Sequence, residues 1–214
     1  MVVYSVNQHI AVFGNSGLLS LYHSYQMARM IDPTYSSETP ELKSDNTDIE
    51  AIIERIEGCV KDISLGFERW DDPYARGPGL YFVIERDSLA ELAVPMGRNR
   101  WSIEDCATVF AETDAFLETA QNVALSRDGA VVVHSDGTIE EEMVRVKQLS
   151  PVECRRNDDL PYAGWMGARH MSALETSARK EVIAAITLSE EDGRVTVFTD
   201  GTFEDSLATS LVVD

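Results

Sequence analysis

Three short polar segments, far apart along the chain, carry residue types that bind metal ions and phosphate groups. They are residues 128–130 (Asp-Gly-Ala), 167–173 (Gly-Ala-Arg-His-Met-Ser-Ala) and 189–191 (Ser-Glu-Glu). The carboxylates of Asp128, Glu190 and Glu191 are the hard oxygen ligands that Mg²⁺ or Mn²⁺ prefers. Arg169 and His170 can neutralise phosphate charge. Transfer of a nucleotidyl group needs little more, because positioning and charge stabilisation carry such reactions.

The segment 167–173 lies between a loop rich in Pro, Gly and aromatic residues and a helix predicted over 174–184. Small residues at a helix N-terminus leave free backbone N–H groups and the positive end of the helix dipole, which suit an anion. The alternative is an ordinary helix cap beside a surface arginine. His170 could equally be a buried, satisfied histidine, Asp128 a plain turn residue, and the Glu190–Glu191 pair a solvated surface.

The remaining pattern predicts the elements that position these segments. Residues 80–84 read as a buried strand, and residues 182–188 as the end of a helix leading into another strand. Apolar residues at helical spacing predict a helix over 48–67. A second helix is expected from Ser102, whose spacing to Asp105 resembles a capping box, to about Leu117. Nearer the start, we expect a strand over 1–6 and a helix over 17–30.

An internal echo links residues 128–141 with residues 192–205. Both copies read as a strand, an Asp-Gly turn and a second strand. Shared turn chemistry explains the echo better than duplication does, because a single repeated hairpin is too little for a solenoid. The copies differ after the first Asp-Gly, where Ala130 in one copy corresponds to Arg194 in the other. A small residue at that place would let a ligand approach the backbone closely.

Composition limits the class of protein. The 214 residues carry a net charge of −19, and only four of the 18 basic residues are lysines. This balance resembles proteins from salt-loving organisms, the alternative being an acidic protein from an ordinary cytoplasm. It disfavours nucleic acid as a partner, since phosphate backbones require a basic surface.

No apolar run is long enough to span a membrane and no signal peptide is evident, so we expect a cytoplasmic protein. Cys59 and Cys106 are expected to be small buried residues.

In order and spacing, the three polar segments resemble the diadenylate cyclases, a family that makes cyclic di-AMP from two ATP. That family's pattern is an Asp-Gly-Ala turn, then a Gly-Thr-Arg-His-Arg segment followed by small residues, and often a Ser-Glu-Glu after the next strand. The resemblance covers about residues 77–200. It implies a catalytic assembly of two domains that meet head to head, each bringing one ATP, and hence a homodimer or a larger homo-oligomer.

The resemblance also implies roles for individual residues. Asp128 would bind Mg²⁺ or Mn²⁺ and help to activate the ribose 3′-hydroxyl, with Glu191, and Glu190 as the weaker candidate, completing the metal site. Arg169 and His170 would hold the triphosphate and the departing pyrophosphate. The other implied substrate-binding residues are Gly129, Ala130, Leu149, Ser150, Gly167, Ala168, Ser172 and Ser189, with Leu149 and Ser150 near the adenine.

Two residues depart from the family pattern. Ala168 stands in place of the threonine and Met171 in place of the second arginine, so a hydroxyl and a cation are missing. Ser172 could restore the hydroxyl. A diadenylate cyclase remains the preferred interpretation, and these departures motivate an alternative, a non-catalytic module that binds an adenine nucleotide or cyclic dinucleotide on the same fold. A further alternative is an interaction protein whose acidic surface serves salt tolerance alone.

The expected fold is α/β, a mixed central β-sheet flanked by helices, with an N-terminal mainly helical extension. We expect that extension to occupy residues 1–70, with a flexible segment near 32–47, and the cyclase-like catalytic domain to occupy residues 71–214.

Overall fold

The computed structural model describes residues 2–6, 9–13, 19–23, 46–72, 74–156 and 159–206. The chain divides into two compact units, Met1–Lys43 and Ser44–Asp214. The predicted boundary near residue 70 is therefore displaced, since the helix predicted over 48–67 belongs to the second unit. The flexible segment predicted near 32–47 lies, up to residue 45, outside the described residues.

The first unit contains an antiparallel sheet in the order β1-β2-β3, formed by β1 (Val2–Val6), β2 (His9–Phe13) and β3 (Leu19–His23). The strand predicted over 1–6 is confirmed. The helix predicted over 17–30 is wrong for residues 19–23, which form the strand β3. Apolar and polar residues alternate along Leu-Ser-Leu-Tyr-His, which is the two-residue period of a strand. Residues 24–30 lie outside the described part of the chain.

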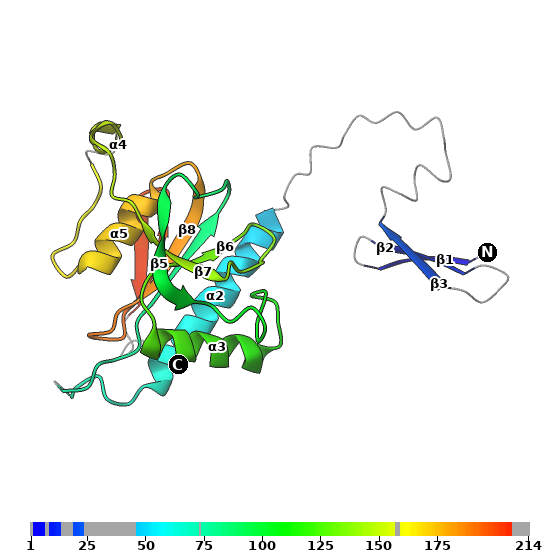
Figure 1. Cartoon of the computed structure of the whole chain (residues 1–214), viewed down its shortest axis with the longest axis horizontal. Helices are drawn as coiled ribbons and strands as arrows, with labels where there is room; N and C mark the ends of the chain where they lie inside the picture. The colour runs from blue at the N-terminus through cyan, green and yellow to red at the C-terminus, as the bar shows by residue number, and fades with distance from the viewer. Residues whose placement is uncertain are drawn as a thin grey trace. The chain divides into compact units, whose positions relative to one another are not determined.

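The second unit holds the elements that position the polar segments (Figure 1). In chain order they are α2 (Asn46–Gly66), β4 (Leu80–Glu85), β5 (Ala93–Arg100), α3 (Thr113–Ser126), β6 (Val131–Val133), β7 (Glu142–Val146), α4 (Pro151–Arg156), α5 (Ala168–Ser177), β8 (Val182–Leu188), β9 (Val195–Thr199) and β10 (Thr202–Ser206).

Five of these strands form one mixed sheet in the order β10-β9-β8-β4-β6. The β4–β6 pair is parallel and the other pairs are antiparallel. A two-stranded ribbon, β5–β7, meets the start of β6 through paired backbone hydrogen bonds between Ala130 and Val144 of 2.7 and 2.9 Å. The predicted mixed sheet flanked by helices is confirmed.

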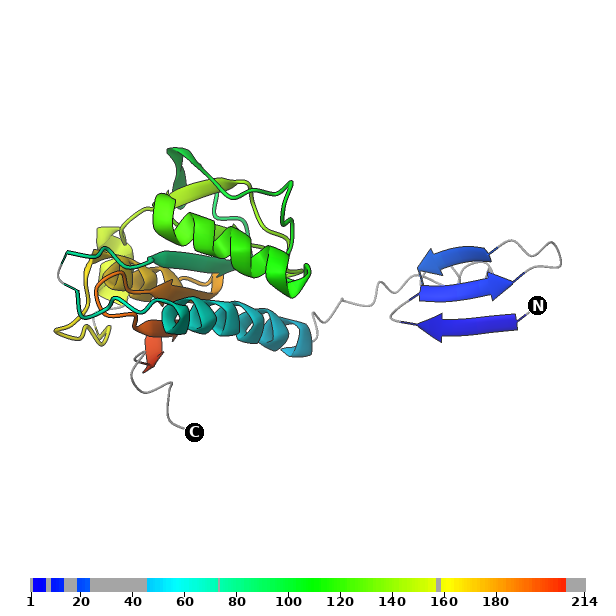
Figure 2. The ribbon, with the colours of Figure 1, turned by 90° about the horizontal axis from the view of Figure 1, so that it is seen from below.

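Two clusters of buried side chains lie on the two faces of the sheet. On one face, α2 and α3 pack against Phe82, Val131 and Ile186. On the other face, α5 packs against Tyr81, Val83 and Ala185. The sheet thus lies between α2 and α3 on one side and α5 on the other. Figures 1 and 2 show these elements from two directions. Side chains alternate along β4 and β8, so each strand contributes to both clusters, and this explains why both strands read as continuous apolar runs.

The helix predicted over 48–67 is confirmed as α2, whose residues Ile52, Ile56, Val60 and Ile63 are buried at the expected spacing. Cys59 and Cys106 are buried free thiols, as predicted. None of the helices in the described ranges combines the length and apolar character that crossing a lipid bilayer requires.

The helix predicted from Ser102 to Leu117 is wrong in its first half. Ser102 does donate a hydrogen bond to Asp105, 2.6 Å long, but the two residues form a turn rather than a helix start. The next residues pair elsewhere, since Thr108 forms an isolated bridge with Thr138 and its hydroxyl donates to the Gly137 carbonyl. The helix α3 begins only at Thr113 and continues to Ser126.

The internal echo corresponds to two different structures. The second copy forms a regular hairpin, β9–β10, in which Thr199 pairs with Thr202 across Asp200 and Gly201. In the first copy, Val133 and Ile139 form only a single bridge, and the chain then leaves to pair β7 with β5. The turn prediction is confirmed for both copies, but a full second strand is present only in the second.

Candidate functional site

The three polar segments meet at one edge of the mixed sheet. Because β4 and β6 are parallel, both strands start at this edge, and because β8 is antiparallel to β4, it ends there. Leu80 at the start of β4 pairs with Leu188 at the end of β8. The topology thus places residues 128–130, which precede β6, next to residues 189–191, which follow β8.

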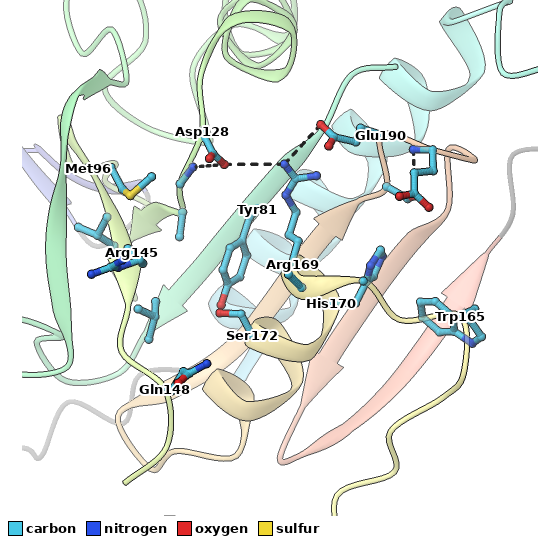
Figure 3. Close-up of a pocket in the computed structure, with 18 of the residues that line it drawn as sticks. Tyr81, Met96, Asp128, Arg145, Gln148, Trp165, Arg169, His170, Ser172 and Glu190 are labelled. Atoms are coloured by element: carbon cyan, nitrogen blue, oxygen red, sulfur yellow. Dashed lines mark hydrogen bonds and ion pairs between the residues drawn. The ribbon is translucent and has the colours of Figure 1, made fainter. Parts of the chain in front are cut away.

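Arg169 joins the three segments (Figure 3). Its Nη2 atom lies 3.9 Å from Asp128 Oδ1 and 3.8 Å from Glu190 Oε2, and its Nη1 donates to the Leu188 carbonyl at 3.4 Å. The side chain is 20% exposed. A single guanidinium therefore holds two carboxylates from different segments, and it has the geometry to bind phosphate oxygens in their place.

A glycine makes room for this guanidinium. A Cβ atom at Gly79 would lie 2.6 Å from Arg169 Nη1 and 3.1 Å from its Cζ.

Arg169 itself lies in the first turn of α5, whose N-cap is Gly167. The helix predicted over 174–184 therefore begins earlier and ends earlier than expected. Its predicted last residues belong instead to β8, where Val182 pairs with Glu85 and Ala184 pairs with Ile84 of β4.

Around Arg169 lies a pocket of about 560 Å³. Its volume is typical of sites for small molecules and cofactors. The predicted site residues that line it are Asp128, Gly129, Ala130, Gly167, Ala168, Arg169, His170, Ser172, Ser189, Glu190 and Glu191. The structure therefore brings together eleven of the residues that the sequence singled out, from three separate segments.

Leu149 and Ser150 do not line this pocket. Ser150 instead caps α4: its hydroxyl accepts from the Glu153 backbone N–H at 3.3 Å, and its own N–H donates to Glu153 Oε2 at 2.7 Å. Hydrogen bonds from the Ser150 hydroxyl and backbone N–H lower the pKa of the Glu153 carboxyl to about 2, with a further contribution from Arg179. The neighbouring residue that does line the pocket is Gln148.

Several lining residues were not expected from the sequence: Tyr81, Met96, Val144, Arg145, Val146, Gln148, Trp165 and Asp192. Most lie on strands, where an apolar or aromatic residue reads as core. Tyr81 is 6% exposed, and burial raises the pKa of its phenol to about 12 against the smaller, opposite effect of the Thr176 and Ser172 hydroxyls. Arg145 could have been found from the sequence, since it is the only cationic residue in the strand β7 and a cation can bind phosphate.

His170 lies deeper than a phosphate-binding cation should. It is 6% exposed, and burial lowers the pKa of its imidazole to about 4, so the ring is neutral near pH 7. Trp165 packs edge-on against it with ring centroids 5.0 Å apart. Within the described part of the chain, its Nε2 atom is buried without a hydrogen-bond partner. His170 therefore borders the pocket as a neutral ring, and the positive charge expected of it is absent.

The carboxylates predicted to bind metal line the same pocket. Among the described residues, no three His, Cys, Asp or Glu side chains gather as a preformed metal cluster. Asp128 is 70% exposed and Glu190 35% exposed, and each approaches the guanidinium of Arg169 from its own side. Their hard oxygen donors fit Mg²⁺ or Mn²⁺ with ligand oxygens completing the shell. Glu190 pairs with Arg169, whereas the sequence favoured its neighbour Glu191 as the metal ligand, and Glu191 lines the same pocket.

Two Asp-Gly turns border the pocket. Gly129 has φ 108° and Gly193 has φ 70°, a region that favours glycine. Ala130 after the first turn is fully buried and pairs with Val144. Arg194 after the second turn stacks on Trp165, with its Cζ 4.2 Å from the ring centroid, and pairs with Asp205. The predicted small-versus-large difference has this outcome: the small Ala130 lines the pocket, and the large Arg194 does not.

Comparison with known proteins places this geometry in a family. Residues 78–203, more than half of the chain, match the model of the family described as DisA bacterial checkpoint controller nucleotide-binding. No curated protein sequence shows significant similarity to the chain.

Solved structures with a similar fold include two that share 18% identity with this chain. One is a double mutant of DacA from Staphylococcus aureus, with a TM-score of 0.45, covering 74% of this chain and 88% of that one. The other is a hypothetical membrane spanning protein from Bacillus cereus, with a TM-score of 0.49, covering 73% and 67%. The family-model match spans all three polar segments, and the chain belongs to the DisA bacterial checkpoint controller nucleotide-binding family.

Proposed function

We propose that this protein is a diadenylate cyclase that condenses two ATP into cyclic di-AMP and releases two pyrophosphates. In each half-reaction a ribose 3′-oxygen forms a bond to the α-phosphorus of the other ATP. The bond from that phosphorus to the bridging oxygen of the β-phosphate breaks, and pyrophosphate leaves with its electron pair. The hydroxyl proton passes to a base or to water.

The convergence of three distant segments on Arg169 carries this proposal. Asp128 and Glu190 both lie within 4 Å of one guanidinium, in a pocket that also contains the start of α5. Carboxylates for a metal, a guanidinium for phosphates and free N–H groups at a helix start are the components that nucleotidyl transfer requires. The family match supports nucleotide as the ligand.

The residues of this chain would divide the work as follows. Arg169 binds the triphosphate and the departing pyrophosphate, and stabilises charge that develops on the leaving group. Asp128, which is largely exposed, would orient the 3′-hydroxyl and accept its proton. Gly129, Ala130, Gly167, Ala168, Ser172 and Ser189 line the remaining surface against ribose and phosphate.

Mg²⁺ or Mn²⁺, held by Asp128 with Glu190 or Glu191, would neutralise phosphate charge and polarise the α-phosphate. The pocket volume of about 560 Å³ suits one nucleotide. Ring closure needs a second ATP in the opposite orientation, so a second copy of the chain must supply it. The catalytic unit we propose is therefore a two-fold symmetric homodimer or a larger assembly that contains one.

The test is incubation of the purified chain with ATP and Mn²⁺, with products identified by mass spectrometry. We expect cyclic di-AMP and pyrophosphate in a ratio of one to two. Asp128→Asn should lower the rate by a factor of about 10²–10⁴ because it removes the proton acceptor and a metal ligand. Absence of cyclic di-AMP from wild-type protein that binds ATP would overturn the proposal.

Asp136→Asn is the matched control. Asp136 also precedes a turn glycine, its Oδ1 accepts the Thr138 N–H at 2.9 Å, and it lies outside the pocket. An asparagine can accept the same hydrogen bond, so activity and thermal stability should stay near wild type. An equal loss in both variants would show that turn geometry, and no special role of Asp128, explains the effect.

A non-catalytic nucleotide-binding module is the second candidate. Ala168 lines the pocket where the family resemblance expects a threonine, and Met171, which is 39% exposed, stands where it expects an arginine. Calorimetry that shows binding of ATP or cyclic di-AMP without turnover would favour this candidate over the cyclase.

The acidic composition supports a further part of the proposal, adaptation to high salt. With a net charge of −19, the folded chain repels itself, and salt screens that repulsion. We therefore expect both stability and activity to rise between low salt and molar KCl. A decline of both over this range would contradict a salt-loving origin.

A further inference from the structure

The connection between α2 and β4, described over residues 67–72 and 74–79, packs against the turn that carries Glu190. The Trp70 side chain packs between the two segments, and its Nε1 donates a hydrogen bond to the Ser64 carbonyl at 2.9 Å. A Cβ atom at Gly77 would lie 2.3 Å from Trp70, and one at Gly193 would lie 2.6 Å from it. The Gly77 N–H also donates to the Glu190 carbonyl at 3.1 Å. This connection is therefore a fixed part of the site's border.

The connection brings a second arginine to the site. Arg76 donates from Nε and Nη2 to Glu190 Oε2, at 3.1 and 3.0 Å. The same oxygen lies 3.8 Å from Arg169 Nη2. A second cavity, of about 450 Å³, is lined by this connection together with Glu190 and Glu191, and so adjoins the first. Two guanidinium groups thus converge on one anionic oxygen where the two cavities meet.

Two guanidinium groups around one oxygen form the environment that a phosphate prefers. In the ligand-free protein, Glu190 fills that position with its own carboxylate. Arg76 is 79% exposed and Glu190 is 35% exposed, so both side chains can rearrange when a stronger anion arrives. The charge of Arg76 also comes from outside the matched family segment, which begins at residue 78.

We propose that Arg76 and Arg169 together bind the terminal phosphates of the nucleotide, and that Glu190 occupies this phosphate subsite until the nucleotide displaces it. The proposal rests on the proposed function in so far as it takes ATP as the ligand. It assigns the cation missing at Met171 to a different element, the connection that precedes β4. The base and ribose would lie in the first cavity, and the β- and γ-phosphates toward the second.

The test compares two ligands by calorimetry on the full chain with Mg²⁺. One is α,β-methylene-ATP, whose bridge cannot be cleaved, and the other is AMP, which lacks the terminal phosphates. Arg76→Gln should weaken the ATP analogue about tenfold, as loss of a charge-assisted hydrogen bond predicts, and leave AMP nearly unchanged. Arg76→Lys should lie between, because it keeps the charge without the planar fork.

Arg86→Gln is the charge-matched control, since Arg86 is exposed and lines neither cavity. It removes one positive charge from an acidic protein and should leave both affinities within about twofold of wild type, because a distant exposed charge is screened. If Arg76→Gln weakens AMP as much as the ATP analogue, or weakens neither, the phosphate subsite does not exist.

A second arm tests the displacement of Glu190. With EDTA present, Glu190→Gln removes a competing carboxylate without a metal to lose, so the ATP analogue should bind severalfold more tightly. The gain should vanish in the Arg76→Gln/Glu190→Gln double variant, because the two residues act through the same oxygen. Weaker binding by Glu190→Gln under EDTA, or a gain that survives in the double variant, would overturn this part.

The two proposals can fail separately. A chain that binds the analogue through Arg76 but yields no cyclic di-AMP refutes the cyclase and retains the phosphate subsite. A chain that forms cyclic di-AMP while Arg76→Gln binds the analogue normally refutes the subsite alone. A wild-type chain that binds no adenine nucleotide refutes both.

Discussion

Two Asp-Gly turns border the pocket with similar backbone conformations and different consequences. At the first, Asp128 is 70% exposed and faces Arg169, and the small Ala130 follows. At the second, Asp192 is 46% exposed, its Oδ1 accepts the Arg194 N–H at 3.2 Å, and Arg194 covers Trp165. The difference teaches that the turn itself fixes only the backbone. Both carboxylates line the pocket, but Asp128 pairs with Arg169, whereas Asp192 pairs with the arginine that follows its own turn.

The largest contrast should come from exchanging each turn glycine. Gly129→Ala and Gly193→Ala should each lower the free energy of unfolding by about 1–3 kcal/mol, because both require positive φ. Gly129→Ala should also reduce the rate of cyclic di-AMP formation about 10²-fold, since it displaces Asp128. Gly193→Ala should reduce the rate less, because its added methyl group meets Trp70 and acts on the site only through that side chain. Denaturant unfolding and the product assay measure the two effects. Equal losses of rate would erase the distinction between the turns.

A smaller effect is expected from a substitution at Gly79, the residue that makes room for the guanidinium of Arg169. A methyl group at Gly79 would contact the guanidinium, the far end of a flexible side chain, so the fold should tolerate Gly79→Ala. The guanidinium must move, however, and we expect affinity for α,β-methylene-ATP to fall about tenfold with the melting temperature little changed. Gly58→Ala in α2, where a Cβ meets open space, is the control. Unchanged nucleotide affinity would mean that Arg169 does not bind phosphate.

The contacts of Arg194 after the second turn should matter for stability more than for catalysis. Arg194→Ala removes the stack on Trp165 and the pair with Asp205, and should cost about 1–2 kcal/mol of unfolding free energy. The cyclase rate at saturating ATP should stay near wild type. A large loss of rate with little loss of stability would place Arg194 in the ligand site and contradict its structural role.

A last effect, seen only on acidification, concerns His170, which packs on Trp165. Burial lowers the pKa of His170 to about 4 from the ordinary 6.5. The unfolded chain therefore binds more protons than the folded protein between pH about 6.5 and about 4, and stability should fall as the pH decreases through this window. Unfolding free energies measured across it should decline less steeply for His170→Gln. Identical slopes would mean that His170 is not buried in neutral form.

The parts of this fold that the sequence predicts are those where burial and period agree. The helix α2 and the strand β4 have one such pattern each, and both were correct. The helix expected from Ser102 failed because local spacing imitated a cap while Thr108 was needed to pair with Thr138. Long-range pairing of this kind leaves no trace in the local sequence.

The site shows the same division. Asp128, Arg169 and Glu190 were predicted because charged residues in ordered motifs stand out, and all three line the pocket. Tyr81 and Met96 could not be separated from ordinary core residues, since their contribution depends on which face of a strand meets the cavity. The role of Arg76 depends on a loop that packs through Trp70, which no motif records.

The convergence of the polar segments on one edge of the sheet leaves the opposite edge free for engineering. The turn after β6 lies there, and its residues Ser135 and Asp136 are exposed. Loop tips of this kind tolerate inserted sequence. A fluorescent reporter spliced between these two residues would sit at the end of β6 remote from Asp128, and would allow the assembly of two copies to be followed by energy transfer while the nucleotide sites stay intact.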